Sequence, residues 1–381
     1  MRPLRPRVDI PVCDPAPDVA RRTALAERGR FLGRQEAWEE MAQMILEAEA
    51  ERRLTPGLTP VASLLALGAR SDVMHAVEGA VARNDTAVVH TMLGALEANL
   101  EERPDCPATG YVVAATHVDV AQAWRGAADL HRLAPVRRDA HDRHMRAAAQ
   151  LVDRFDPFEC HSPLWAMIRC AVLDVDPAPA QRVCDDYEDL LELDPGCPDH
   201  LVSMGRDLLP RRFGTWEVLD REARRAVVLT RDIWNMGGYA WVYIGALEAD
   251  PGAFRRLDAE LFVEGLHDIL ARAPGQHMAN RMAAFCGLTL AGPAQRGSTH
   301  ERLHHCFAWI AQDHLRELHP VVWATAPARH CVDPGGIAED DLVRRGRARA
   351  ISSLAAYYAP ALDVGRRLVF TPEGIEMPRI T

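Results

Sequence analysis

The sequence predicts an all-α protein in which stacked antiparallel helix pairs form an α-solenoid, with a small C-terminal β-hairpin. Three observations predict this fold class. Apolar residues recur at helical spacing along most of the 381 residues, and strand-like alternation is almost absent until the C-terminal end. Alanine, leucine and arginine dominate the composition, and these residues lose little conformational freedom in a helix. Short Pro-containing turns interrupt the pattern at intervals of roughly 18 to 22 residues, which is typical of helical repeats.

The expected helices follow one another from residue 34 onward. In the segment 256–272, for example, Leu257, Phe262 and Leu266 belong to a wide apolar stripe. One helix cannot bury such a stripe, so a neighbouring helix must cover it. Helices are predicted at 34–53, 59–69, 71–83, 85–101, 108–125, 136–153, 161–173, 178–192, 198–209, 215–230, 235–248, 256–272, 275–290, 298–318 and 338–358.

Asp-Pro pairs end several of these helices, because the residue before a proline is pushed out of the helical region. Two turns are nearly alike: residues 103–107 are Arg-Pro-Asp-Cys-Pro, and residues 194–198 are Asp-Pro-Gly-Cys-Pro. In both, the second proline suits the first position of the next helix, where its missing N–H is not needed. We therefore expect equivalent corners, each joining two helices of a stacked pair.

The predicted organisation has three parts. Residues 1–17 form an extended N-terminal segment, residues 18–330 form the helical-repeat array, and residues 331–381 form a C-terminal helix and hairpin packed on the array. The hairpin is placed at 368–377, where a proline and a glycine suit a type I turn. Because two strands alone are marginally stable, the hairpin needs the support of the helical body.

One segment has the form of a junction between helical repeats. Residues 193–201, Leu-Asp-Pro-Gly-Cys-Pro-Asp-His-Leu, pass from one helix to the next, and two further segments are Ala-Trp-Arg-Gly at 123–126 and Leu-Pro-Arg-Arg-Phe-Gly-Thr-Trp at 209–216. Together they resemble bacterial tetratricopeptide-repeat-like α-solenoid proteins of uncharacterised function, over roughly residues 85–290. The resemblance implies that structural repeat positions are occupied by Trp124, Gly126, Pro195, Pro198 and Trp216.

Composition restricts the class of protein. The net charge of −10 at pH 7 argues against a nucleic-acid binder, for which a basic domain is expected. The longest apolar stretches, such as residues 239–247, are too short to span a membrane, and no apolar core follows the basic N-terminus as in a signal peptide. Nine cysteines are scattered without a C-x-x-C pair, so neither a disulfide framework nor a zinc clasp is expected. A cytoplasmic location is the simplest interpretation.

One string suggests a metal site. Residues 300–304 are His-Glu-Arg-Leu-His, so His300 and His304 have the spacing of zinc ligands and Glu301 the position of a general base. The extended motif needs Gly at 307 and His at 310, but Phe and Ile stand there. No third ligand follows at a familiar spacing, which weakens the zinc interpretation.

The same string has a structural interpretation. Ser298 and Glu301 fit a capping box, in which the glutamate reaches back to the N-cap amide. His300 and His304 then share one helix face with apolar residues, which indicates packing.

Two other sets of residues are candidates for sites. His141 and His144 are flanked by arginines, which disfavour a divalent cation, so we expect a solvated helix face. Trp124 and Trp216 are expected in the core rather than as ligand platforms. No Gly-rich phosphate loop and no cysteine with a histidine at a recognisable spacing is present, so no cofactor is expected.

The sequence therefore favours a non-catalytic protein–protein interaction scaffold or adaptor. The concave face of the helical array would bind a protein or peptide partner. The alternative is a zinc-dependent hydrolase or peptidase that uses His300, Glu301 and His304.

Overall fold

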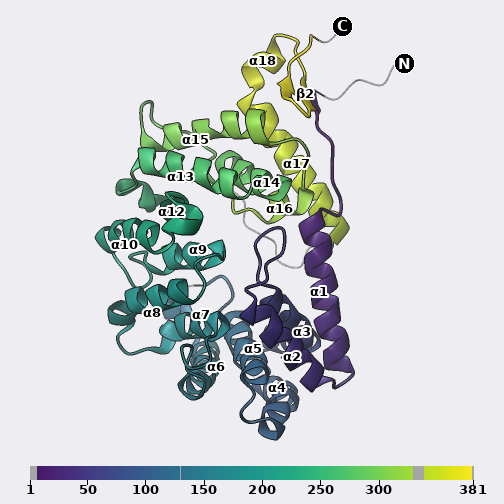
Figure 1. The fold of residues 1–381 in the computed structure, drawn as a ribbon, viewed down its shortest axis with the longest axis vertical. Coiled ribbons are helices and arrows are strands. Elements are labelled where there is room, and N and C mark those ends of the chain that lie inside the picture. Colours follow the sequence, from purple (N-terminus) through teal and green to yellow (C-terminus); the bar gives the residue numbers. More distant parts are fainter. Residues whose placement is uncertain (1–6, 129, 329–338, 380–381) are drawn as a thin grey trace. The chain divides into compact units, whose positions relative to one another are not determined.

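The computed structural model describes residues 7–128, 130–328 and 339–379 (Figure 1). Helices account for 72% of the protein, and the described residues contain one sheet of three short strands. These features confirm the predicted all-α fold class with its small C-terminal hairpin. The regular stacking of an α-solenoid stays a prediction.

The chain forms two compact units. Residues 21–200 make the first unit, and residues 201–381 together with residues 1–20 make the second unit. The predicted division at residues 17 and 330 stays a prediction, and part of it, at residues 1–6 and 331–338, lies outside the described residues.

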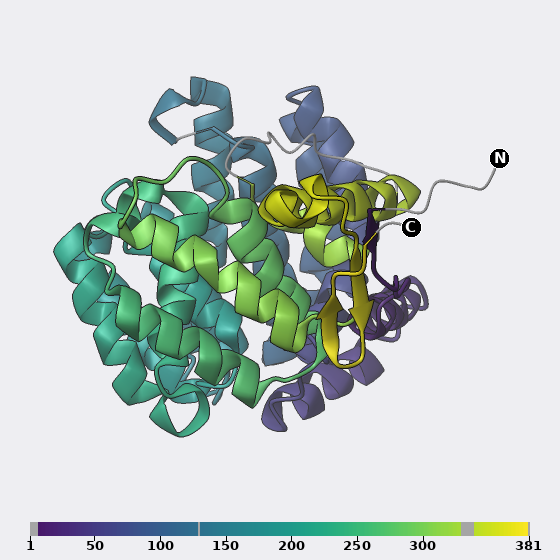
Figure 2. The same ribbon diagram turned by 90° about the horizontal axis from the view of Figure 1, so that it is seen from above.

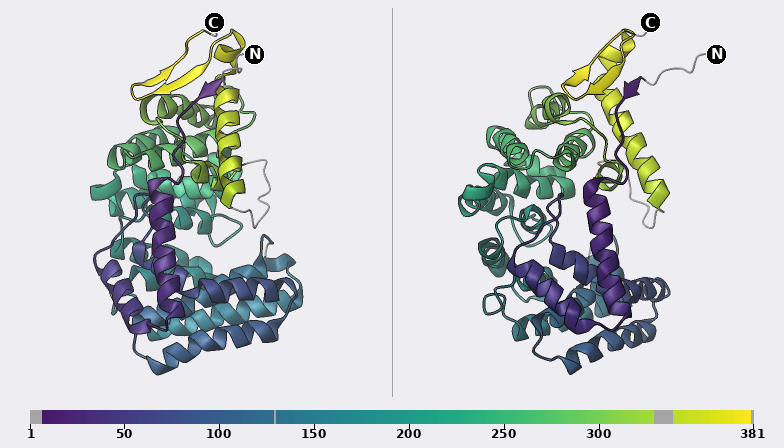
Figure 3. Two further views of the ribbon diagram at one scale, coloured as in Figure 1. Left: turned by 90° about the vertical axis from the view of Figure 1, so that its right-hand side faces the viewer. Right: turned by 45° about the vertical axis from the view of Figure 1, so that its right-hand side comes forward.

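The first unit contains long helices joined by short turns. Pairs such as α5 and α6, α2 and α3, and α7 and α8 pack against each other, and Figure 3 shows α4, α5 and α6 as rods that lie side by side. The elements are α1 (Pro17–Arg34, which begins in the second unit), α2 (Trp38–Ala50), α3 (Val61–Ala82), α4 (Thr86–Glu102), α5 (Pro107–Arg125), η1 (Leu130–Arg132), α6 (Pro135–Arg154), α7 (Pro163–Ala171), η2 (Val172–Val175), α8 (Pro179–Leu193) and α9 (Pro198–Asp207, which ends in the second unit).

Helix α1 was not predicted, and α3 was predicted as two helices. Both differences arise where α1 and α3 pack through glycines instead of apolar side chains. A Cβ atom on Gly68 would lie 1.9 Å from the backbone oxygen of Ala26, and one on Gly29 would lie 2.0 Å from the backbone oxygen of Leu65. Backbone contacts of this kind leave only a weak apolar stripe on α1, and they explain why a glycine is kept inside α3 without ending it.

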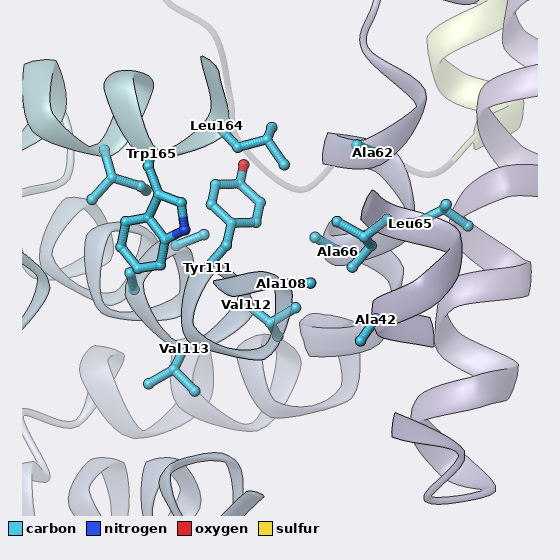
Figure 4. Packing of buried hydrophobic residues seen from close by; sticks show 14 of the residues in the cluster. Ala42, Ala62, Leu65, Ala66, Ala108, Tyr111, Val112, Val113, Leu164 and Trp165 are labelled. Atoms are coloured by element: carbon cyan, nitrogen blue, oxygen red, sulfur yellow. The ribbon is translucent and has the colours of Figure 1, made fainter. Parts of the chain in front are cut away.

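A group of aromatic side chains forms part of the hydrophobic core of the first unit (Figure 4). The ring of Trp165 stacks on Phe155 at 4.9 Å and meets Tyr111 edge-on at 6.3 Å. The indole N–H of Trp165 donates to the carbonyl of Pro107 at 3.2 Å, so its polar atom is satisfied in an apolar surround. This cluster joins α5 to α7.

The second unit is also helical, and its α12 is buried along most of its length. The stripe predicted in 256–272 is confirmed, since Phe262 and Leu266 are fully buried. Its elements are α10 (Trp216–Leu229), α11 (Arg231–Trp234), α12 (Gly237–Ala249), η3 (Pro251–Arg255), α13 (Ala259–Arg272), α14 (Gln276–Ala284), the π-helical turn η4 (Phe285–Thr289), α15 (Thr299–Trp309), the π-helical turn η5 (Ile310–His314), α16 (Pro320–Thr325), α17 (Glu339–Tyr357) and α18 (Ala359–Asp363).

The predicted hairpin forms from β2 (Leu368–Thr371) and β3 (Gly374–Glu376), paired antiparallel. The N-terminal segment adds a strand that was not predicted: β1 (Val8–Asp9) pairs parallel to β2. The hairpin lies against η5 (Figure 2). Arg316, two residues after the end of η5, donates to the carbonyl of Pro372 at 2.7 Å. The expected support from the helical body is therefore present.

Candidate functional site

A groove runs along the first unit between the end of α1, the start of α2, and helices α3 and α4. It has about 1050 Å³ of empty space and opens to solvent. Its lining comes from four helices and their caps: Gly33, Arg34, Glu36, Trp38, Ala69, Asp72, Val73, Ala95, Leu96, Ala98, Asn99, Glu102 and Arg103.

Small residues form much of the groove. A Cβ atom on Gly33 would lie 3.0 Å from the backbone oxygen of Ala69, so α1 and α3 meet here nearly backbone to backbone. On α4, Ala95 and Ala98 expose methyl groups where longer side chains would fill the space. The groove therefore leaves room for another chain to approach the helix backbones.

Charged residues of both signs border these small residues. Arg34 makes a bidentate ion pair with Asp72, with Nε–Oδ2 at 2.6 Å and Nη2–Oδ1 at 2.8 Å. The Arg34 guanidinium lowers the pKa of the Asp72 carboxyl, and the carboxylate raises the pKa of Arg34. Glu102 and Arg103 add a second pair of opposite charges at the end of α4. A polar border of this kind suits a polypeptide better than an apolar small molecule.

The His-Glu-Arg-Leu-His string lies on α15. The Nε2 atom of His300 lies 2.7 Å from the carbonyl oxygen of Leu290, and its ring packs 5.0 Å from Phe254. His304 is half-buried beside Tyr357 at 5.5 Å, and burial lowers the pKa of its imidazole. Within residues 7–128, 130–328 and 339–379, no third ligand atom joins this pair within 4.8 Å. The zinc hydrolase stays a prediction, as the alternative function.

The capping box on α15 forms in a modified way. The Ser298 hydroxyl accepts the Glu301 backbone N–H at 3.2 Å, as predicted. The Glu301 carboxylate, however, accepts the N–H of Gly297 at 2.6 Å instead of the N-cap amide. The Ser298 amide is already occupied, because it donates to the carbonyl of Gln295 at 3.0 Å.

The expectation of a solvated face at His141 and His144 is wrong for His141, which is fully buried. Its arginine-rich helix α6 packs along α5, and His141 faces Asp142 at 2.9 Å and Asp174 at 3.7 Å. Burial alone would lower the pKa of His141, but these carboxylates outweigh it and raise the pKa. Burial and the neighbouring His117 lower the pKa of His144 to about 4.

The residues assigned to repeat positions lie at element ends or in the core. Trp124 is fully buried, and Gly126, at φ +60°, ends α5. Pro198 is the first residue of α9, and Pro195 lies in the turn before it. Trp216 begins α10 and, contrary to the core position expected for it, is only half-buried, with Arg255 above its ring at 5.8 Å. These placements show local roles and leave the repeat itself a prediction.

The structure brings together a Cys–His–Asp cluster that the sequence reasoning missed. Asp194, Cys197 and His200 are all buried at the turn between α8 and α9, with their potential ligand atoms within 4.8 Å of one another. Burial by itself lowers the pKa of His200, but Cys197 and Asp194 outweigh it and raise the pKa to about 10. The sequence signal that could have revealed this cluster is the C-x-x-H spacing of Cys197 and His200, which places both side chains near one turn at the start of α9.

A small pocket lies beside this cluster and is lined in part by Glu49, Arg52, Asp194 and His200. Glu49 accepts hydrogen bonds from the Ser162 hydroxyl at 2.5 Å and the Leu164 amide at 3.1 Å. Arg52 donates to the carbonyl of Leu193 at 3.1 Å. These hydrogen bonds connect the ends of neighbouring helices, and Cys197 is fully buried. We therefore interpret the cluster as a structural element of the turn between α8 and α9.

Comparisons with protein families, curated proteins and solved structures gave no match for this chain. The resemblance to tetratricopeptide-repeat-like proteins therefore stays a prediction. None of the helices in the described part of the chain is long and apolar enough to cross a membrane.

Proposed function

We propose that the protein is a non-catalytic protein–protein interaction module and that the groove between α1, α3 and α4 binds a peptide or a partner helix. The observation that supports this most is the groove itself, a solvent-open depression lined by residues of α1, α2, α3 and α4. In this proposal, the groove takes the role that the sequence analysis gave to the concave face of the helical array.

The lining favours an extended or helical segment as the occupant. Small residues such as Ala69 and Ala95 let a bound backbone come close, as at helix-in-groove sites. Arg34 and Asp72 already satisfy each other, so a partner with charges of both signs would gain mainly specificity and association rate from the border of the groove. Nucleic acid is a poor candidate, given the net charge of −10.

A cytoplasmic location is part of this proposal. The eight described cysteines are thiols that are not joined in disulfides, and four of them are buried. Free thiols are typical of proteins in a reducing compartment.

The test is affinity capture with a matched pair of variants. Ala95→Arg places a long charged side chain in the groove, whereas Ala87→Arg makes the same change at an exposed position of α4 outside the lining. A groove partner should be captured by the wild-type protein and by Ala87→Arg, and lost with Ala95→Arg. Capture of the same proteins by both variants would place binding elsewhere, provided that both variants keep the wild-type circular dichroism spectrum.

A further inference from the structure

A second cluster of potential metal ligands lies in the second unit. Val12 and Leu318 form a parallel β-bridge, in which the Cys13 amide donates to the carbonyl of Leu318 at 2.9 Å. Residues that flank a bridged pair point to the opposite face from it. Cys13, Glu317 and His319 therefore share one face, and their potential ligand atoms lie within 4.8 Å of one another.

Two amides of α14 hold the turn that carries Glu317 and His319. Asn280 is fully buried; it accepts the His319 amide at 2.9 Å and donates to the carbonyl of Glu317 at 2.9 Å. Gln276 accepts the backbone N–H groups of Arg316 at 2.8 Å and of Glu317 at 3.2 Å. The backbone under both side chains is therefore fixed before any ligand binds, which lowers the cost of binding.

Cys13, Glu317 and His319 offer a sulfur, an oxygen and a nitrogen ligand atom, and the cluster is partly exposed to solvent. His319 is 2% exposed, and its Nε2 lies 3.0 Å from the Glu317 carboxylate. Its Nδ1 is buried and has no hydrogen-bond partner among the described residues. Cys13 and Glu317 are half-buried, so solvent reaches one side of the cluster.

Charge at the cluster also favours a cation. The Glu317 carboxylate lies beside the Cys13 thiol, with the potential ligand atoms within 4.8 Å of each other. In the described part of the chain, His319 makes the one ion pair found for Glu317, and no arginine pairs with that carboxylate. A divalent cation would bind next to this carboxylate and take Cys13 as a thiolate, because a metal-bound thiol loses its proton.

We propose that Cys13, Glu317 and His319 bind a zinc ion. A thiolate, an imidazole and a carboxylate are all zinc ligands, whereas magnesium and calcium prefer oxygen atoms alone. Ligand atoms of a tetrahedral zinc site lie about 3.3–3.8 Å apart, so small side-chain rotations close the cluster around the ion. Three protein ligands leave a fourth position for solvent, as in catalytic or exchangeable zinc sites.

Two nearby residues would form the surroundings of this site. The ring of His277 lies 6.3 Å from that of His319, and its Nδ1 lies 3.7 Å from the carboxylate of Asp18. Carboxylate–histidine pairs next to a metal centre orient the ligands and adjust the charge around them. The zinc site thus joins the N-terminal segment, α14 and the turn before α16. It is independent of the proposed groove, which lies in the first unit.

The test uses the full-length protein without a histidine tag, stripped with a chelator and titrated with Co²⁺. Cobalt is a suitable probe because it takes zinc sites and gives an intense near-ultraviolet band when a thiolate binds it. We expect one equivalent of bound Co²⁺ with this band, followed by displacement by Zn²⁺. Loss of an outer partner of a metal site costs about 10–100-fold in affinity, so Cys13→Ser and Glu317→Gln should each weaken binding by at least about tenfold.

Three controls decide the outcome. Cys160→Ser changes a half-buried free cysteine of the first unit and should keep the band, as should His304→Ala on α15. Circular dichroism confirms that each variant is folded. The proposal is overturned if the wild-type protein binds no Co²⁺, if Cys13→Ser and Glu317→Gln both bind like wild type, or if the band disappears with His304→Ala or Cys160→Ser instead.

Discussion

The imidazole Nε2 of His200 lies 3.4 Å from the carboxylate of Asp194, and both side chains are buried at the corner between α8 and α9. A protonated His200 is held there by Asp194 and by Cys197. This corner follows the first unit's last complete helix, so its charge state bears on the stability of the fold.

The pKa of His200 predicts how stability changes with pH. It rises from 6.5 to about 10 on folding, so the folded protein holds this proton more tightly than the unfolded chain. The stabilisation is fully present below about pH 6.5 and is lost as the pH rises towards 10. Through this window the group lowers the free energy of unfolding by at most about 1.4 kcal/mol per pH unit.

Urea unfolding at pH 7 and pH 9.5 measures this effect. His200→Gln should make the free energy of unfolding less dependent on pH than in the wild-type protein. His75→Gln, at an exposed position of α3, should leave the dependence unchanged. An identical pH dependence in wild type and His200→Gln would show that His200 is not held protonated.

The glycine contact between α1 and α3 gives a second prediction. Gly68→Ala would bring a Cβ atom within 1.9 Å of the backbone oxygen of Ala26, so α1 must shift, at a cost of about 1–3 kcal/mol or more. Gly94→Ala, in α4 with no atom within 4 Å of its new Cβ, should instead stabilise by about 0.5–1 kcal/mol. Thermal unfolding compares the two variants; a Gly68→Ala protein as stable as the wild type would contradict the close packing of α1 on α3.

The apolar stripe of α13 gives a third prediction. Leu266 is fully buried, so Leu266→Asp should cost more than about 3 kcal/mol by burying a charge without a partner. Val228→Asp, at a site that is 73% exposed on α10, should change the free energy of unfolding by less than about 0.5 kcal/mol. An unchanged melting temperature for Leu266→Asp would refute the assignment of this stripe to the core.

Two variants on α15 separate a structural helix from a zinc hydrolase. Glu301→Gln should be almost silent, because an amide oxygen can still accept the N–H of Gly297. His304→Ala should cost about 1–2 kcal/mol of stability through lost packing and leave the metal content unchanged. Loss of one zinc per chain with His304→Ala, together with loss of peptidase activity in Glu301→Gln, would establish the hydrolase.

Sequence reasoning placed most helices and failed where packing is not carried by apolar side chains. The stripe of α13 and the prolines at the start of α5 and α9 could be read directly, because periodicity and N1 prolines are local signals. Helix α1 could not, since it packs on α3 through glycine backbone. Strand β1 is two residues long and pairs with β2, which is some 360 residues away in the chain, so no local pattern reveals it.

The candidate sites also differ in whether they could be found from the sequence. The groove and the cluster of Cys13, Glu317 and His319 combine residues distant in the sequence, which become neighbours only through the fold. The burial of His141 was hidden by the arginines that flank it on α6. By contrast, Cys197 and His200 are three residues apart at the start of α9, and a search for cysteine–histidine pairs at helical spacing would have found them.

The central claim, that the groove between α1, α3 and α4 binds a protein segment, is tested most directly by hydrogen–deuterium exchange with a captured partner. The account predicts slower exchange in residues 33–38, 69–73 and 95–103 when the partner is added, and no such change for Ala95→Arg. Slower exchange confined to other segments, or the same protection in Ala95→Arg as in the wild-type protein, would contradict it.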